Sequence, residues 1–139
     1  MAKNYELLEH TADIGIRVKA FSLAGLFKNA GLAIRDICAE KQKTQYPVRH
    51  KIRIVQKAAN LEELFLNWLN ELLSRSAVEA LIFENIQIKQ VNEKSVEAIV
   101  IGSDIRNYKV NTEIKAATYH QLKVKKIGFF WQAEVIFDV

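Results

Sequence analysis

The 139-residue sequence contains few of the residues that define several common protein classes. Its only cysteine, Cys38, excludes an internal disulfide and provides no paired-cysteine metal motif. Cys38 falls in an apolar stretch with helical spacing, so we expect a small buried hydrophobic side chain and not a reactive thiol. There is one proline, and no segment has the biased composition of a linker. The sequence therefore predicts a single compact domain over residues 1–139.

Targeting and membrane signals are also missing. No apolar run reaches the roughly 18 residues that a membrane span needs, and the N-terminus "MAKNYELLEH" lacks the apolar core of a signal peptide. We therefore expect a cytoplasmic protein with no membrane partner. Twenty Lys and Arg against sixteen Asp and Glu give a formal charge of +4. These charges are interspersed, and no basic stripe or aromatic stacking motif stands out, so the composition permits contact with RNA without arguing for it.

No common catalytic signature is present. The sequence has no G-x-S-x-G motif, no glycine-rich phosphate loop and no H-E-x-x-H motif. Its three histidines, His10, His50 and His120, are too far apart in the sequence to form a local metal motif. We expect a protein that is not an enzyme on its own.

Hydrophobic periodicity indicates two strand–helix units at the start of the chain. Residues 14–20 alternate as a half-buried strand, and Ser22 can cap a helix that runs to about Cys38. Residues 48–55 alternate again, with one basic face. Asn60 and Glu63 then form a capping-box pair that begins a second helix with a long apolar stripe.

The rest of the chain reads as strands, over residues 81–91, 95–102, 112–124 and 129–139. Two strand–helix units followed by a run of strands predict a two-layer α+β domain. In this fold, two helices pack on one face of a mostly antiparallel or mixed β-sheet.

Acidic side chains occur at the ends of two expected strands. Asp13, in "EHTADIGI", precedes the first strand, and Asp138 lies on the polar side of the last, next to Val139. If these strands were neighbours, both carboxylates and the main-chain oxygens of Val139 would form an oxygen-rich cluster. Such a cluster suits a divalent cation, with Ca²⁺ preferred and Mg²⁺ or Mn²⁺ as alternatives. The plainer alternative is a capped turn and a solvated aspartate.

A second concentration of polar side chains occurs in "TEIKAATYH". Strand alternation places Glu113, Lys115, Ala117 and Tyr119 on one side, with His120 beside them. Lys115 could keep nearby carboxylates ionised or contact a phosphate, whereas the plainer interpretation is an ion-paired outer sheet face. We take Glu113, Lys115, His120 and His10 as residues that support a site or contact a partner.

Four separated motifs together resemble the archease family, namely "YELLEHTADIGI", "NLEELFLNWLNELL", "TEIKAATYHQLKV" and "WQAEVIFDV". The resemblance spans nearly the whole chain. It implies an accessory protein for the GTP-dependent RNA ligase that joins 3′-phosphate or 2′,3′-cyclic-phosphate ends to 5′-hydroxyl ends in tRNA splicing and RNA repair. Such a protein promotes guanylylation and multiple turnover of the ligase, with tRNA as an indirect partner.

The same resemblance implies a metal site at Asp13, Asp138 and Val139, the residues already suspected as an oxygen cluster. The sequence departs from the family pattern at Gly25, where the family usually has glutamate, and in "SRSAVEALIF", which lacks the acidic residue common after the second helix. Both departures lie outside the four motifs and concern the surface that would meet a partner.

A different class of function is an alternative. The basic strand surface that includes Arg49, Lys51 and Arg53 could serve a nucleic-acid or protein chaperone. Salt separates the two hypotheses, because a phosphate-binding surface loses affinity steeply as salt rises. A metal-dependent activator should respond instead to chelation and to changes at Asp13 and Asp138.

Overall fold

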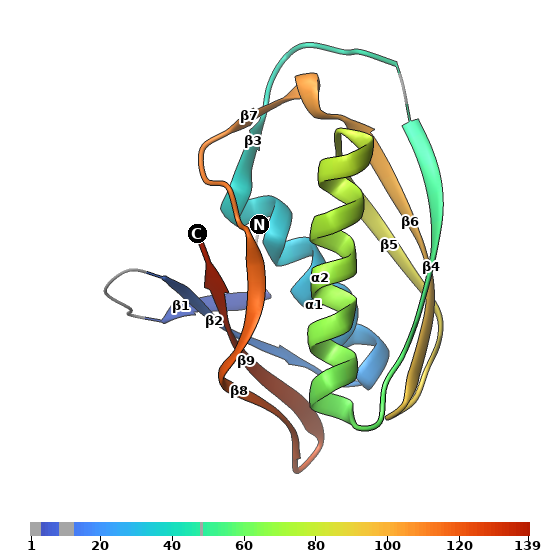
Figure 1. The fold of residues 1–139 in the computed structure, drawn as a ribbon, viewed down its shortest axis with the longest axis vertical. Helices are drawn as coiled ribbons and strands as arrows, with labels where there is room; N and C mark the ends of the chain where they lie inside the picture. Colours follow the sequence, from blue (N-terminus) through green and yellow to red (C-terminus); the bar gives the residue numbers. More distant parts are fainter. Residues whose placement is uncertain (1–3, 9–12, 48) are drawn as a thin grey trace.

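The computed structural model describes residues 4–8, 13–47 and 49–139. For Arg49 it describes the backbone and not the side chain. Two long helices run through the middle of the molecule, with strands on either side (Figure 1). The elements in chain order are β1 Tyr5–Leu8, β2 Ile14–Ala20, α1 Leu23–Cys38, β3 Ala39–Lys41, β4 Arg49–Lys57, α2 Leu61–Glu79, β5 Leu81–Val91, β6 Ser95–Asp104, the 3-10 turn η1 Ile105–Asn107, β7 Tyr108–Val110, β8 Ala116–Ile127 and β9 Phe130–Asp138.

The strands form three sheets, and every strand pair in the described residues is antiparallel. The largest has the order β1-β2-β9-β8, the second β4-β6-β5, and β3 pairs with β7. The α+β class predicted from the sequence is confirmed. The structure adds that the strands do not share one sheet, because the helices lie between the two larger sheets and contact both.

Both helices begin where the sequence predicts. The Ser22 side chain accepts a hydrogen bond from the Gly25 N–H, and the Asn60 side chain accepts one from the Glu63 N–H. These caps satisfy N–H groups that have no partner within the helix. Glu63 completes the second cap by accepting a bond from the Ala59 N–H, one residue before the expected partner.

Aromatic side chains fill the space between the two helices. The Phe27 and Phe65 rings meet edge to face with centroids 5.3 Å apart, and Trp68 is fully buried beside them. The Trp68 indole N–H donates to the Phe27 carbonyl at 2.9 Å, so burial leaves no indole donor unsatisfied. The apolar stripe of α2 is thereby fixed against α1.

Several strand boundaries differ from the sequence-based prediction. The short strands β1, β3 and β7 were not predicted, because periodicity has little to act on over three or four residues. Residues 112–115, predicted as part of a strand, precede β8. Within the described residues, no helix combines the length and apolar character needed to cross a membrane.

Candidate functional site

The first and last predicted strands are neighbours in the structure. β2 pairs with β9 from Ile14 opposite Phe137 to Ala20 opposite Trp131. Asp13 immediately precedes the first of these pairs and Asp138 immediately follows it, so the two aspartates lie at the same end of adjoining strands. This adjacency is the condition on which the sequence-based metal hypothesis depends, whereas metal binding itself stays a prediction.

The residue just before β8, Lys115, is also at this edge. The Lys115 N–H donates to the Asp138 carbonyl at 2.8 Å, and Ala116 pairs with Asp138. Asp13 is half-buried, while Asp138 and Val139 are exposed. The segment before β8 is therefore tied by its backbone to the end of β9, where Asp138 and Val139 are exposed.

The Lys115 side chain is exposed and forms no ion pair within the described residues. The predicted face of Glu113, Lys115, Ala117 and Tyr119 is wrong, because Ala117 is buried while the other three are exposed. The reason is that residues 112–115 lie outside β8 and need not follow its alternation.

Further along β8, the pairing with β9 is irregular around another predicted residue, His120. Gln121 has a φ of 54°, and the β8–β9 register shifts between Thr118 and Lys123. His120 lies inside this irregular stretch and is exposed. His10, the remaining predicted supporting residue, lies outside the described residues.

The donor set at this edge consists of oxygen atoms. Asp13 and Asp138 contribute carboxylates and Val139 contributes main-chain oxygen, which fits a hard cation and not a thiolate or imidazole metal. Among residues 4–8, 13–47 and 49–139, no group of three or more His, Cys, Asp or Glu side chains comes together. Any cation at this edge would therefore be held by few protein ligands.

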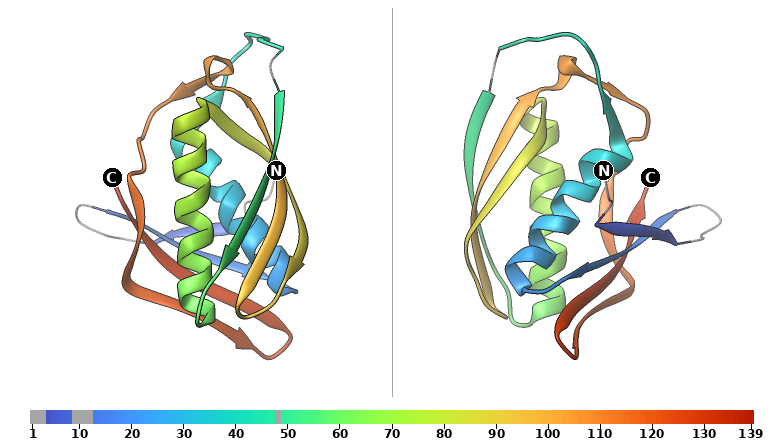
Figure 2. Two further views of the ribbon diagram at one scale, coloured as in Figure 1. Left: turned by 45° about the vertical axis from the view of Figure 1, so that its right-hand side comes forward. Right: turned by 180° about the vertical axis from the view of Figure 1, so that it is seen from behind.

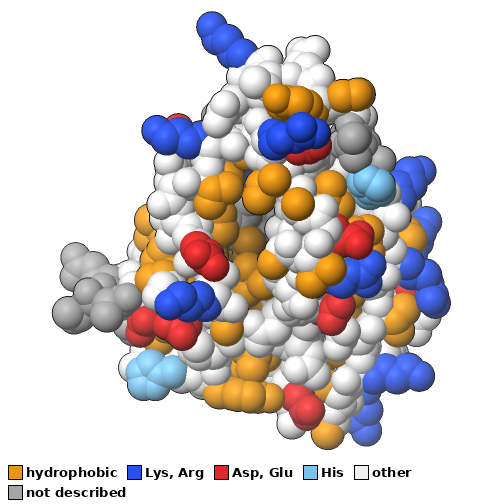
Figure 3. Space-filling model, turned by 45° about the horizontal axis from the view of Figure 1, so that its top comes forward, with side chains coloured by type: hydrophobic (Ala, Val, Ile, Leu, Met, Phe, Trp, Pro, Cys, Tyr) orange, Lys and Arg blue, Asp and Glu red, His pale blue; other side chains and the backbone are white. Residues whose placement is uncertain are grey.

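An apolar cavity of about 390 Å³ opens near this edge, and Figure 3 shows it as a hollow walled by hydrophobic side chains. It lies between α1 and α2 and is closed by η1, β7 and the segment before β8. Glu113 lines its mouth and Cys38 its wall. Cys38 packs against the core but is half-buried, less than the full burial expected from the sequence, and burial raises the pKa of its thiol.

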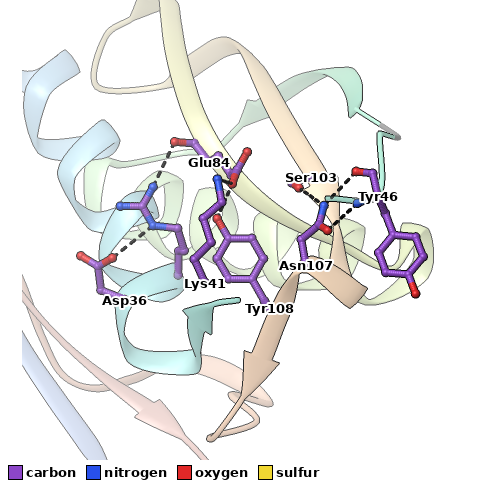
Figure 4. Close-up of polar contacts among 8 residues, drawn as sticks. Asp36, Lys41, Tyr46, Glu84, Ser103, Asn107 and Tyr108 are labelled. Carbon is purple, nitrogen blue, oxygen red and sulfur yellow. Dashed lines mark hydrogen bonds and ion pairs between the residues drawn. The ribbon is translucent and has the colours of Figure 1, made fainter. Parts of the chain in front are cut away.

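A polar network beside this cavity joins β3, β5 and β7 (Figure 4). The Tyr108 hydroxyl donates to the Glu84 carboxylate, which Lys41 also contacts at 3.3 Å. Burial, and then the bond to Glu84, raise the pKa of Tyr108, so the phenol stays neutral at physiological pH. These residues join β3, β5 and β7, and their role is to fix these strands.

Asn107 makes a second set of bonds in this network. Its amide donates to the Tyr46 carbonyl at 2.9 Å and to the Ser103 hydroxyl at 3.0 Å, and its oxygen accepts from the Tyr46 N–H. Asn107 and Ser103 are the buried polar residues of the described chain. No sequence motif marked them, because their partners come from distant segments.

The alternative basic surface lies on β4, at an edge of the three-stranded sheet. Lys51 and Arg53 are exposed there, but the Arg53 guanidinium donates to Glu97 on β6 at 2.9 Å. Part of the positive charge on this surface is therefore neutralised within the chain.

Comparison with known proteins agrees with this arrangement of motifs. Residues 5–139 match the model of the Archease protein family (MTH1598/TM1083). The archease of Methanosarcina barkeri is 32% identical, covering 99% of this chain and 97% of that protein. The archease of Pyrococcus abyssi is 33% identical, covering 99% of both.

Two solved structures share the fold. The solution structure of Methanobacterium thermoautotrophicum protein 1598 has a TM-score of 0.75 at 22% identity and covers 99% of this chain and 100% of that chain. The crystal structure of an archease from Thermotoga maritima, described as a possible chaperone, has a TM-score of 0.68 at 24% identity and covers 95% of this chain and 94% of that chain. The match to the family model across nearly all of the sequence, together with these relatives, shows that this chain belongs to the archease family.

Proposed function

We propose that this protein activates a GTP-dependent RNA ligase that joins 3′-phosphate to 5′-hydroxyl ends, by promoting guanylylation and multiple turnover of the ligase in tRNA splicing or RNA repair. The observation that supports the proposal is that Asp13 and Asp138 flank the same end of the β2–β9 pair in a chain of the archease family. With this role we propose a cytoplasmic location.

The acidic edge would hold a divalent cation, with Ca²⁺ preferred, through Asp13, Asp138 and Val139. When bound, the cation supplies positive charge that can offset the charge of nucleotide phosphates. Ca²⁺ takes roughly six to eight oxygen ligands, so three protein residues leave positions for water or for the partner. The Lys115 N–H bond to Asp138 orients the end of β9, and the exposed Lys115 ammonium can contact a phosphate on the ligase.

Guanylylation of the ligase is the direct test. The purified ligase from the same genome is incubated with labelled GTP, with and without this protein, and labelled ligase is followed over time. We expect Asp13→Asn and Asp138→Asn to reduce the stimulated rate at least tenfold, and Asp13→Asn to remove a single Ca²⁺ or Mn²⁺ site in calorimetric titration. Glu93→Gln is the matched control, because Glu93 is exposed in the β5–β6 turn and lines a hollow with Trp131 at the other end of β9.

Full stimulation by both aspartate variants would overturn the metal role, and no stimulation by the wild-type protein would overturn the activator role. GTP hydrolysis or RNA joining by this protein without ligase would contradict a non-catalytic role.

Lys115 allows a separate test of the same edge. Lys115→Ala should reduce stimulation while the melting temperature stays unchanged, because the side chain is exposed and unpaired in the described structure. Lys115→Arg should restore only part of the activity, since a planar guanidinium does not reproduce a compact ammonium charge. Full stimulation by Lys115→Ala would assign the residue to the solvated surface.

A further inference from the structure

The four-stranded sheet has an outer face that combines basic and aromatic side chains. β-Sheet alternation and the strand register define its rows. Lys19 on β2 lies opposite Gln132 on β9, which lies opposite Lys125 on β8. Two residues further toward the β8–β9 hairpin, Phe130 on β9 lies opposite Ile127 on β8. Phe21, which directly follows the end of β2, extends this second row. We call Lys19, Phe21, Lys125, Ile127 and Phe130 the Phe–Lys surface.

An independent observation brings the members of this surface together. Lys19, Phe21 and Phe130 line one shallow hollow at the end of β2, which Gly25 and Asn29 of α1 border, and the Lys19 ammonium lies 5.6 Å from the centre of the Phe130 ring. Phe21 is 89% exposed, and Phe129, at the tip of the β8–β9 hairpin, is 92% exposed. Fully exposed phenylalanine rings cost solvation free energy, so two of them at one end of a sheet indicate a contact surface.

The charges of this surface are not neutralised within the described chain. Lys19 and Lys125 form no ion pair there, whereas the next row toward the acidic edge is balanced by bonds from Arg17 to Glu134 at 2.7 Å and to Glu6 at 3.6 Å. Lys19 and Lys125 are separated by two strand spacings, or roughly 10 Å. The Phe–Lys surface thus presents two free positive charges beside an aromatic row.

The surface is also uncovered. The core side chains of this sheet, including Ile16, Val18 and Val135, point to the side that packs on the helices. Both helices lie on that one side when the molecule is viewed from different directions (Figure 2). The Phe–Lys surface is on the other side, so a ligand can approach it without any rearrangement of the fold.

We propose that the Phe–Lys surface binds single-stranded RNA, with bases stacked on Phe21 and the neighbouring rings and with phosphates contacted by Lys19 and Lys125. Proteins bind single strands by this combination of stacking rings and flanking positive charge, and a sheet surface is a common platform for it. A peptide partner with acidic residues would use the same charges and rings, so the experiment below has to distinguish RNA from protein. This RNA site goes beyond the activator role, because it needs neither the ligase nor the acidic edge.

Fluorescence anisotropy of a labelled uridine 12-mer with the full-length protein tests the proposal in the absence of ligase. We expect binding that weakens as salt rises, and a loss of about tenfold in affinity for Phe21→Ala, within the range for removal of one stacking ring. Lys125→Gln should weaken binding and lower the slope of log affinity against log salt by about 0.7, the value for one phosphate contact on a single strand.

Lys51→Gln, on the exposed basic strand β4, is the matched control for Lys125→Gln, and its slope should stay unchanged. Circular dichroism melts verify that Phe21→Ala folds, as its 89% exposure implies. The proposal is overturned if the wild-type protein does not bind the oligonucleotide at 50 mM salt. It is also overturned if only Lys51→Gln weakens binding. A third outcome that overturns it is a Phe21→Ala variant with lower ligase stimulation and wild-type RNA affinity, because the surface would then bind protein.

Discussion

The α2 residue Asn70 holds the start of β8, and its replacement provides a quantitative test of how the acidic edge is positioned. The Asn70 amide oxygen accepts from the Ala117 N–H at 2.8 Å, and its NH₂ group donates to the Ala117 carbonyl at 3.1 Å. β8 is the outer strand of its sheet, so these two backbone groups have no strand partner on that side. Asn70→Ala removes both bonds.

The magnitude follows from the burial of Ala117, which is 4% exposed. A buried backbone group that loses its partner costs about 1–3 kcal/mol. Because Asn70 is only half-buried and water can replace part of its role, we take the lower end for each of the two groups, or roughly 2–3 kcal/mol together. Alanine recovers about 0.6 kcal/mol through helix propensity, which leaves a loss of roughly 2 kcal/mol. For a domain of this size, the melting temperature should fall by roughly 6–10 °C.

Thermal unfolding followed by circular dichroism measures this loss, and Asn67→Ala is the matched control. Asn67 is half-buried on the same helix, with no side-chain hydrogen bond in the described structure, so its replacement should leave stability unchanged or slightly higher. Amide exchange at Ala117 should also accelerate in Asn70→Ala. If both variants melt together, the Asn70 bonds do not stabilise β8 and the reasoning is refuted.

Two further predictions concern titratable groups. Bonds from the Arg106 side chain and N–H lower the pKa of Asp104 from 3.8 to about 2, so this contribution to stability is present above pH 3.8 and is lost as the pH falls through about 2. Asp104→Asn should therefore melt below the wild type at pH 6, with a difference that shrinks below pH 4, and a constant difference down to pH 2 would contradict this. Burial raises the pKa of the Cys38 thiol, so alkylation by iodoacetamide at pH 7.5 should be at least tenfold slower in the folded protein than in urea, as followed by mass spectrometry. Equal rates in the two conditions would show that the thiol is freely accessible.

Local structure was predictable from the residues alone where the signal is short-range. Ser22 and Asn60 mark helix starts because a cap involves residues three positions apart, and the alternation of residues 14–20 gives β2 its observed bounds. The α+β class followed from the order of these elements. Motif spacing also identified the family, since it requires no knowledge of contacts between distant segments.

Strand pairing could not be predicted from the sequence. Alternation assigns each residue to a face but does not say which strand lies alongside, because the hydrogen-bond partners of a strand are non-local. The sequence therefore placed Asp13 and Asp138 at strand ends without bringing them together, and it divided the strands among too few sheets. The sequence-based prediction also extended the last-but-one strand over residues 112–115, although the backbone there is not part of β8.

The Phe–Lys surface shows the same limit most clearly. Phe21, Lys125 and Phe130 are unremarkable in sequence, and no stacking motif was found there. Pairing of β2 with β9 and of β9 with β8 places Lys19, Lys125 and the aromatic row on one face. Burial of Ile16, Val18 and Val135 on the opposite side fixes the sheet register, since a shift of one residue would exchange the two faces. This register leaves the two lysines and Phe21 exposed and Phe130 half-buried.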